Sequence, residues 1–403
     1  MTQRVELGGV PTGPLSGVKV IDFTAVYSGP IAASILGDQG AEVIKVESAA
    51  GDLMRRGLPQ SKGMGSAFVA MNRNKRSLCL DLQTTAGRNV ARRLVATADV
   101  VMENFRPGVM DRLGLGYDSF KATQPKLVYA SINGMGETGP YAKRRVYDAI
   151  IQAVSGFATL QPGGDPQMVN SLVCDKITSL TAAEAIVAAL FQAERSGKGQ
   201  KVDVSMLDAN LNFLWPDVMN NHTFTAPGLE QMPHVDHSIF LRKTSDGWIA
   251  TMPVQQNEVL GAFRALEVEA LFNDERFNSF EARTRNRALL RELMDEAYLR
   301  FTTEQLCERM EQHDVPYARV NLREEVPDDP QIQAMGALWE YEHPLAGPVR
   351  TPRPAAQFAQ TPSNIRAHTP TLGEHNAEIL AELGYAASEV HALDEQGVIY
   401  ADS

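Results

Sequence analysis

The sequence predicts an α/β protein whose larger domain is doubly wound around a parallel sheet. Short apolar runs rich in β-branched residues alternate with helical segments between residues 17 and 134. This alternation is the pattern of βαβ units, whose strands run parallel. The chain of 403 residues is also longer than a single hydrophobic core usually grows, so we expect a second, smaller domain.

The first βαβ unit is expected near the start of the chain. GVKVIDF (17–23) predicts a buried strand, and the loop TAVYSG follows it. Pro30 suits the first turn of a helix, and Gly40 can end that helix in a left-handed conformation. AEVIKVE (41–47) predicts the second strand. The pattern then repeats, with strands at 77–82, 99–105 and 126–134 and a helix after the first of these.

From Asp175 onward the sequence predicts longer helices, a linker and a further β-hairpin. An Ala-rich segment after Asp175 predicts a long helix, a turn and a strand (KVDVSML) follow it, and a second long helix is expected over 207–221. Residues 223–233 are polar and contain two prolines, which is typical of a linker. A β-hairpin is expected around Asp246-Gly247, followed by amphipathic helices to about residue 312.

The last part of the chain is rich in proline from about residue 325 onward. Proline favours extended chain over helix or central strand, and one further helix is expected in LGEHNAEILAELGY. We therefore expect residues 1–222 to form the first part of a large α/β domain and residues 223–330 a linker and a small α+β domain. Residues 331–403 should be a return linker and the C-terminal part of the large domain.

Composition and charge exclude several classes of function. With 38 Lys+Arg against 49 Asp+Glu, the net charge of −11 disfavours nucleic-acid and anionic-membrane partners. Three distant cysteines without a CxxC motif (Cys79, Cys174, Cys307) disfavour a zinc site and indicate a reducing compartment. The start of the chain lacks a signal-peptide pattern, and no apolar run approaches the roughly 18 residues of a membrane span. A cytoplasmic enzyme is the resulting expectation.

The motifs also exclude familiar chemistry from the first half. All eight histidines lie at or after His222, so a Ser-His-Asp site within the α/β domain is excluded. The loop after the first strand has a single glycine where dinucleotide binding requires three, although Glu47 imitates the ribose-binding acid. We therefore expect neither NAD nor a catalytic metal, and acid–base or nucleophilic work falls to carboxylates, Tyr, Lys or Cys.

Two features have a functional and a structural interpretation, and both stay open. Basic residues cluster at Arg73, Lys75 and Arg76, at Arg106 and Arg112, and at 143–145; they could hold a phosphate-rich ligand or be solvated surface charge. Asp175 precedes the Ala-rich helix. It could be the N-cap of that helix, or a carboxylate that the helix dipole keeps ionised.

Several segments in order along residues 14–375 resemble the class III CoA-transferases, the CaiB/BaiF-type family that includes formyl-CoA transferase and carnitine CoA-transferase. The matching stretches are PLSGVKVIDFTAVYSGP, GAEVIKVE, NKRSLCLDL, DVVMENFRPGVMDRLGLGY, ASINGMGETGP, VYDAIIQAVSG, GKGQKVDVSMLDA and PTLGEH. The resemblance implies a large Rossmann-like domain and a smaller α+β domain in an interlocked homodimer. It also implies CoA and acyl-CoA as substrates, with a free carboxylic acid as acceptor.

The resemblance also implies roles for individual residues. Asp175 matches the catalytic aspartate, which attacks the acyl-CoA thioester to form an acyl-aspartyl anhydride and then an aspartyl-CoA thioester. Tyr147 and Asp148 are expected close to Asp175. The positions that match CoA-binding residues are Val26, Tyr27, Ser28, Asn74, Leu80, Asn104, Phe105, Arg106, Arg112 and Arg145. His375 is expected to make a structural hydrogen bond.

Alternative functions remain open at this point. The related α-methylacyl-CoA racemases have a histidine before the acid of the VYD motif, whereas this chain has Tyr147 before Asp148. A racemase would therefore lack one base of its proton transfer. This chain also shows no glycine-rich loop between His237 and Gln256, which leaves an acyl-CoA lyase or thioesterase conceivable. A non-catalytic CoA-binding protein is the remaining alternative.

Overall fold

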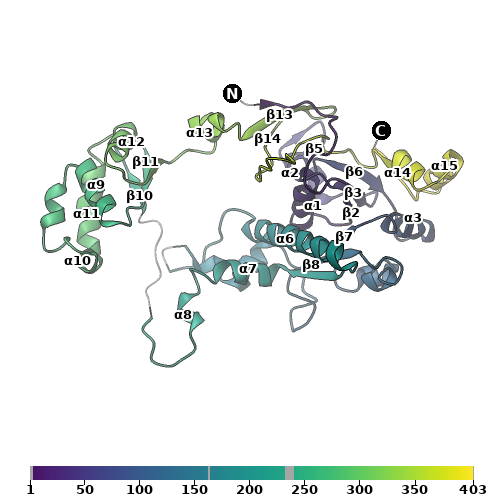
Figure 1. Ribbon diagram of the computed structural model, residues 1–403, viewed down its shortest axis with the longest axis horizontal. Helices are drawn as coiled ribbons and strands as arrows, with labels where there is room; N and C mark the ends of the chain where they lie inside the picture. The colour runs from purple at the N-terminus through teal and green to yellow at the C-terminus, as the bar shows by residue number, and fades with distance from the viewer. Residues whose placement is uncertain (1–2, 162–163, 232–239, 403) are drawn as a thin grey trace. The chain divides into compact units, whose positions relative to one another are not determined.

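The computed structural model describes residues 3–161, 164–231 and 240–402 (Figure 1). The chain forms two compact units. The large unit contains Met1–Gln231 and Gln333–Ser403, and the small unit contains Met232–Ile332.

The large unit is built on a parallel sheet of six strands. In spatial order these are β6 (Lys75–Cys79), β3 (Glu42–Glu47), β2 (Lys19–Asp22), β7 (Val100–Glu103), β8 (Val128–Asn133) and β9 (Lys201–Ser205). The order runs outward from β2 in one direction and continues from β7 in the other, which is the doubly wound arrangement. The predicted α/β fold with a parallel sheet is confirmed.

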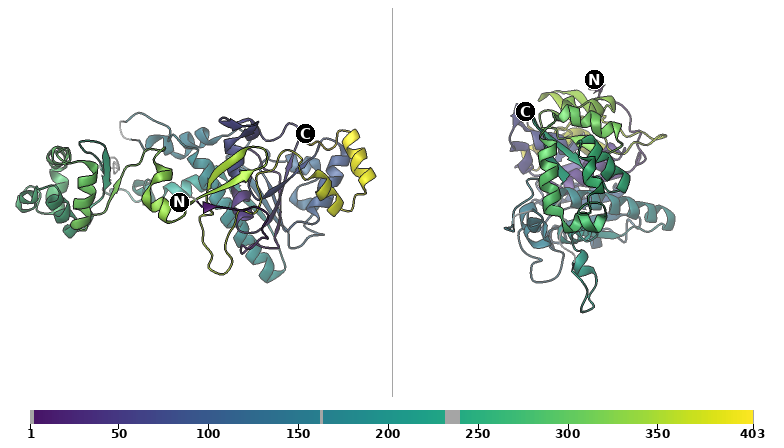
Figure 2. Two further views of the ribbon diagram at one scale, coloured as in Figure 1. Left: turned by 90° about the horizontal axis from the view of Figure 1, so that it is seen from above. Right: turned by 90° about the vertical axis from the view of Figure 1, so that its left-hand side faces the viewer.

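Helices cover both faces of this sheet, because successive strand residues point to opposite sides. On one face, Val20 and Val43 pack with α1 (Ser28–Asp38) and α6 (Val173–Ser196). On the other face, Ile21 and Ile44 pack with three helices. These are α3 (Thr85–Val95), α14 (Asn376–Glu382) and α15 (Ala387–Glu395), which lie at the same end of the picture in both views (Figure 1; Figure 2, left). The chain's last helices therefore complete the core that its first strands begin.

Two predictions for the large unit need correction. The helix expected over 207–221 ends early: α7 spans Met206–Leu214, and a separate short helix, α8, spans Asn220–Thr223. Pro216 follows within two residues of the end of α7, and proline disfavours helical conformation in the residue before it. The proline-rich tail is extended as predicted, but it also forms an unpredicted antiparallel pair.

That pair consists of β13 (Leu338–His343) and β14 (Gly347–Pro352), and β1 (Gln3–Arg4) joins β13 on its other side. Strand β14 is therefore an edge strand. An edge strand tolerates Pro348 and Pro352 because one row of its backbone groups needs no partner in the sheet. Shorter elements complete the large unit: β4 (Gln60–Ser61), β5 (Met64–Gly65), α2 (Ser66–Met71), α4 (Val109–Leu113) and α5 (Asp148–Ser155). Along the chain, the short helix α13 (Pro330–Ala334) begins in the small unit and ends in the large one.

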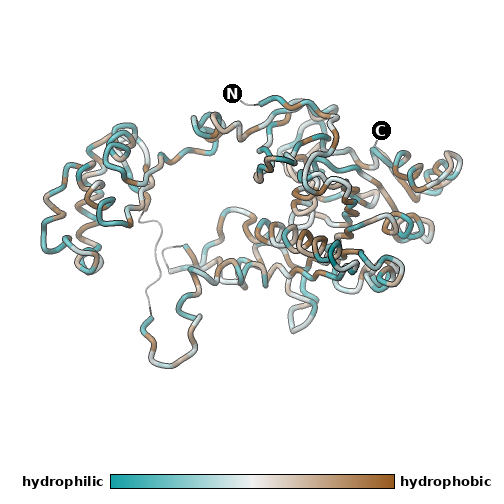
Figure 3. Tube along the Cα trace, in the orientation of Figure 1, coloured by the Kyte–Doolittle hydropathy of each residue, from teal (hydrophilic) through white to brown (hydrophobic). Residues whose placement is uncertain are grey.

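The small unit contains an antiparallel sheet of β10 (Leu241–Lys243), β11 (Trp248–Thr251) and β12 (Tyr317–Arg319). The hairpin predicted around Asp246-Gly247 is confirmed, while residues 237–239 of that segment lie outside the described part of the chain. The helices are α9 (Gln256–Ala265), α10 (Phe280–Arg285), α11 (Arg287–Tyr298) and α12 (Thr303–Gln312). Hydrophobic and hydrophilic stretches alternate along them, as in amphipathic helices (Figure 3). Among the helices described, none is long and apolar enough to cross a bilayer.

Candidate active site

A pocket of about 280 Å³ opens where the strand order of the large sheet reverses. Its walls include the loop after β2 (Ala25–Ser28), the segment after β7 (Asn104–Pro107) and the end of β8 (Ile132–Gly134). Doubly wound sheets bind their ligands at the carboxyl ends of the strands at this switch point. Asp175 lines the same pocket, so the fold brings the candidate nucleophile to the usual ligand site.

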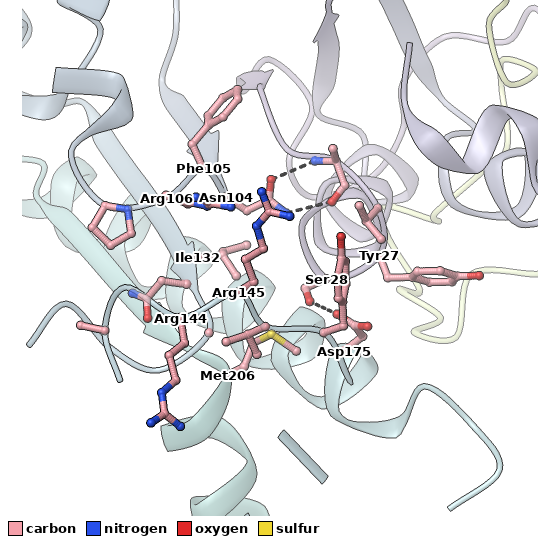
Figure 4. Close-up of a pocket in the computed structure, with 18 residues that line it drawn as sticks. Tyr27, Ser28, Asn104, Phe105, Arg106, Ile132, Arg144, Arg145, Asp175 and Met206 are labelled. Carbon is pink, nitrogen blue, oxygen red and sulfur yellow. Dashed lines mark hydrogen bonds between the residues drawn. The ribbon is translucent and has the colours of Figure 1, made fainter. Parts of the chain in front are cut away.

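Asp175 lies in the first turn of α6, which begins at Val173 with Leu172 as the preceding cap residue. The N-cap interpretation of Asp175 is therefore wrong. Its backbone N–H donates to Asp148 Oδ1 over 3.0 Å, while its own side chain points away from the helix and toward Ser28 (Figure 4). The alternative, a carboxylate held at a helix start, agrees with the structure.

Ser28 is the first residue of α1 and contacts the Asp175 carboxylate. Its Oγ donates a hydrogen bond to Asp175 Oδ1 (Figure 4), and its backbone N–H interacts with the same carboxylate. The carboxylate therefore faces the N-terminus of α1 and also lies in the first turn of α6. The positive ends of both helix dipoles favour its ionised form.

Burial works against that ionised form, because the Asp175 residue is only 9% exposed. Desolvation is the largest influence and raises the pKa of Asp175, and the nearby Asp148 carboxylate raises it further. The hydrogen bonds from Ser28 lower the pKa and oppose these two effects. The net effect of these influences is a pKa of Asp175 above its usual range. Reactive groups in clefts often have such shifted pKa values.

Asp148 begins α5 and is buried, at 2% exposure. Its Oδ2 accepts a hydrogen bond of 2.6 Å from Gln152 Nε2, and its Oδ1 accepts the backbone N–H of Asp175. Asp148 therefore fixes the backbone that carries Asp175. Tyr147 precedes it and lines the pocket with a side chain that is largely exposed, at 63%. Both residues lie close to Asp175, as the resemblance implied.

The loop after β2 is held by contacts that the sequence did not reveal. Asn104 makes two reciprocal bonds with Ala25: Ala25 N–H donates to Oδ1 over 2.9 Å, and Nδ2 donates to the Ala25 carbonyl over 2.8 Å (Figure 4). Val26 has a φ of +74°, which is unusual for a β-branched residue and costs conformational energy. Its N–H donates to Asp52 Oδ2 over 3.1 Å, which holds it in this conformation.

A buried ionic network lies beneath that loop. Lys75 Nζ donates to Asp22 Oδ2, the Pro30 carbonyl and Asn72 Oδ1, each at 2.9 Å. Lys45 Nζ donates to the Thr24 carbonyl over 2.8 Å and to Asp52. Burial lowers the pKa of Lys75 to about 8, while the Asp22 carboxylate partly offsets that effect. Lys75 therefore binds residues on both sides of the loop, and Lys45 binds both the residue before the loop and the Asp52 carboxylate that holds Val26.

The first basic cluster consequently has neither of the roles considered from sequence. Lys75 is buried in the network described above, and Arg73 Nη2 pairs with Asp38 Oδ2 over 2.6 Å. Arg76 is part-buried and forms ion pairs with Glu42, Glu378 and Glu382. These three side chains stabilise the large unit internally, which a linear sequence cannot show because their acidic partners are distant. Glu47, the apparent ribose-binding acid, likewise pairs with Arg55 over 2.6 Å.

Other basic residues do face the pocket. Arg106, Arg144 and Arg145 are exposed and line it. Arg144 stacks on the Tyr141 ring at 3.7 Å from its centroid, and Arg145 extends into the pocket (Figure 4). Within the described part of the chain, neither Arg106 nor Arg145 has an ion-pair partner. Both are therefore available to an anionic ligand.

Three predicted CoA-binding residues lie outside this pocket. Asn74 is buried, donates to Asp38 and to the Asn364 carbonyl, and accepts two backbone N–H groups. Leu80 belongs to the hydrophobic core, and Arg112 is exposed on α4. Their contact with CoA stays a prediction. His375 makes the expected structural bond, since its Nδ1 accepts the Ser77 N–H over 3.2 Å.

Sequence reasoning missed part of the pocket wall. Asn133, Gly134 and Met206 line it. The signal for the first two was available, because they end the strand predicted over 126–134 and residues at that position in parallel sheets face ligands. No signal pointed to Met206, which reaches the pocket from the start of α7.

The chain is similar to known proteins over most of its length. Residues 15–376 match the model of CoA-transferase family III. Succinate–glutarate CoA-transferase of Agrobacterium fabrum is 36% identical over 393 residues, which cover 92% of this chain and 96% of that protein. Human succinyl-CoA:glutarate CoA-transferase is 33% identical over 399 residues, covering 96% of this chain and 90% of that protein. The crystal structure of a CaiB/BaiF family protein from Brucella suis has a TM-score of 0.81 and 34% identity, covering 92% of this chain and 100% of that one. The chain therefore belongs to CoA-transferase family III and is a CoA-transferase.

Proposed function

We propose that this enzyme moves CoA from an acyl-CoA to a free carboxylic acid through covalent intermediates on Asp175. The observation that carries the proposal is the position of the Asp175 carboxylate. It lies buried in the wall of the switch-point pocket, and Ser28 holds one of its oxygens. The other oxygen is left to act as a nucleophile.

The first half of the proposed reaction transfers CoA to the enzyme. Asp175 Oδ2 attacks the thioester carbonyl carbon, the carbon–sulfur bond breaks, and the thiolate leaves with the bonding electrons. The product is an acyl-aspartyl anhydride. The thiolate then attacks the Asp175 carbonyl carbon, the donor acid leaves as a carboxylate with one oxygen from Asp175, and an aspartyl-CoA thioester remains.

The second half repeats these steps with the acceptor acid. Its carboxylate attacks the aspartyl thioester, which releases the thiolate and forms a second anhydride. The thiolate attacks the acceptor's carbonyl carbon, so the new acyl-CoA forms and Asp175 regains a carboxylate. One of its oxygens now comes from the acceptor. No step consumes or releases a net proton, which suits a pocket without histidine among its lining residues.

The chain's own residues have distinct roles in this scheme. Ser28 donates to one Asp175 oxygen and orients the other, and Asp148 fixes the backbone at Asp175. Arg106 and Arg145 would bind the phosphates of CoA, since guanidinium groups suit phosphate oxygens. Val26, Tyr27, Asn104 and Phe105 would line the path of CoA at the same edge of the sheet. Burial of Asp175 limits the access of water, which would hydrolyse an anhydride.

Two further features belong to the proposal. The two relatives described above are named for succinate and glutarate, so we propose a dicarboxylic acyl group for this enzyme also. We further propose that the enzyme is a cytoplasmic, interlocked homodimer in which residues 223–330 form the linker and small domain. Light scattering of the purified protein tests the dimer, and a monomeric mass would contradict it.

An exchange assay tests the function. Succinyl-CoA and glutarate are mixed with the wild type, with Asp175→Asn and with Asp165→Asn, and new thioesters are read by mass spectrometry. Asp165 is exposed and does not line the pocket, so it controls for the loss of one charge. We expect glutaryl-CoA from the wild type and from Asp165→Asn only. Undiminished exchange by Asp175→Asn would contradict the proposal, as would free CoA without a new thioester.

A further inference from the structure

The small unit contains a pocket of its own, made entirely by residues outside the Asp175 site. Its volume is about 570 Å³, which is within the range of roughly 300–1,000 Å³ typical of small-molecule sites. Apolar side chains from several segments line it, among them Met252 and Val254 after β11 and Met294 and Tyr298 on α11. Val254 is 70% exposed and Met252 47%. An apolar surface is therefore open to a ligand.

Four arginines interrupt this apolar lining, and no Asp or Glu lines the pocket within the described residues. Three of them, Arg283, Arg287 and Arg291, are spaced four residues apart across α10 and α11. Arg242 and Arg291 share one carboxylate, Asp295, at 2.7 and 3.7 Å. The pocket therefore has more positive charge than its surroundings neutralise.

Among the residues that the structure describes, the other two arginines form no ion pair. Arg283 donates there to two neutral oxygens, the Phe277 carbonyl over 3.0 Å and Gln256 Oε1 over 2.8 Å. Its partial burial lowers its pKa. Arg287 is exposed, and its guanidinium makes no hydrogen bond or ion pair to any residue that the structure describes. Guanidinium groups beside apolar surface suit a ligand that has a carboxylate at one end and an apolar body.

We infer that this pocket binds a free carboxylic acid with an apolar body of several carbons, whose carboxylate is held by Arg283 and Arg287. The apolar body lies against Met252, Val254 and Met294. The inference concerns binding by the small unit alone, and it stands independently of the chemistry proposed for Asp175.

Calorimetry on the full chain tests this site with octanoate as the probe. We expect octanoate to bind, and Arg283→Gln and Arg287→Gln each to weaken it about tenfold or more, because hydrogen bonds to charged groups contribute that much to affinity. Arg264→Gln is the matched control, since Arg264 pairs with Glu269 on the same unit and does not line the pocket. It should leave the affinity unchanged, and 1-octanol should bind at least tenfold more weakly than octanoate.

Competition with CoA separates this site from the Asp175 pocket. We expect saturating CoA to leave octanoate binding to the wild type unchanged. The inference would be overturned by an absence of octanoate binding, by equal affinity for octanoate and octanol, or by arginine variants that bind as the wild type does. Displacement of octanoate by CoA would also overturn it, because the acid would then occupy the CoA site.

Discussion

Replacing Ser28 by alanine removes the hydrogen bond that Ser28 Oγ donates to the Asp175 carboxylate. Burial and the Asp148 carboxylate raise the pKa of Asp175, and the Ser28 side chain is the largest influence that lowers it. The variant should therefore have an Asp175 pKa that is higher still. Because only the ionised carboxylate can attack the thioester in the proposed reaction, the acid limb of the rate profile should move to higher pH.

The structure sets the size of this effect. A hydrogen bond to a charged group contributes about 1.5–3 kcal/mol, and Ser28 and Asp175 are both largely buried, so water replaces it poorly. Each 1.4 kcal/mol corresponds to about a tenfold change in the ionised fraction. At a pH below both pKa values, kcat/KM should fall by about tenfold to a hundredfold. At high pH, where Asp175 is ionised in both proteins, the rates should approach each other.

The assay is kcat/KM for succinyl-CoA with glutarate across the pH range, because this parameter reports ionisation in the free enzyme. Ser179→Ala is the control: Ser179 Oγ donates to the backbone carbonyl of Asp175 over 2.7 Å and does not contact the carboxylate. Its acid limb should stay in place. A Ser28→Ala profile with an unmoved acid limb, or an equal shift in both variants, would refute the reasoning.

Three further outcomes follow from the contacts described. Arg145→Gln should raise KM for acyl-CoA about twofold to fivefold with little change in kcat, because Arg145 is an exposed cation of the pocket. Lys121→Gln, which breaks only the surface pair with Asp118, should change neither. Lys75→Met should lower the free energy of unfolding in urea by about 3–5 kcal/mol, because it leaves the Asp22 charge buried without its ion-pair partner. The double variant Lys75→Met/Asp22→Asn should regain part of this stability. Equal stability of the single and the double variant would contradict the importance of the Lys75–Asp22 pair. Asp175→Asn should raise the unfolding temperature at neutral pH, but not at a pH below the ordinary aspartate pKa. The reason is that folding raises the pKa of Asp175, so the folded state loses stability as the pH increases and the carboxylate ionises. A lower unfolding temperature of the variant at neutral pH would contradict this direction of the pKa shift.

The parallel sheet could be predicted because its four central strands, β2, β3, β7 and β8, are short and largely buried runs. Such runs are a local property of the sequence. The pair β13–β14 could not be predicted, because its prolines favoured unpaired extended chain and only the tertiary position of β14 at an edge permits them. The early end of α7 had a local signal in Pro216, and the predicted helix extended past it.

The candidate site was predictable where the resemblance to the class III CoA-transferases assigned roles to residues. It implied CoA-binding residues after β2 and β7, and the structure brings Ser28, Asn104 and Arg106 to one pocket with Asp175. The partner of each charge was not predictable. Lys75 has its acid at Asp22 and Arg76 has two of its acids on α14, and only the folded chain brings these residues together. For the same reason, the basic cluster at 73–76 looked available to a ligand.

In the proposed reaction Asp175 becomes covalently bonded during CoA transfer, and the fate of its oxygen atoms tests this step most directly. The enzyme is turned over with succinyl-CoA and glutarate whose carboxylates contain heavy oxygen, and the tryptic peptide 146–176 is then sequenced by mass spectrometry. We expect heavy oxygen to enter the Asp175 carboxylate and no other residue of this peptide, Asp148 and Asp165 included. Continued exchange with no label at Asp175 would contradict it.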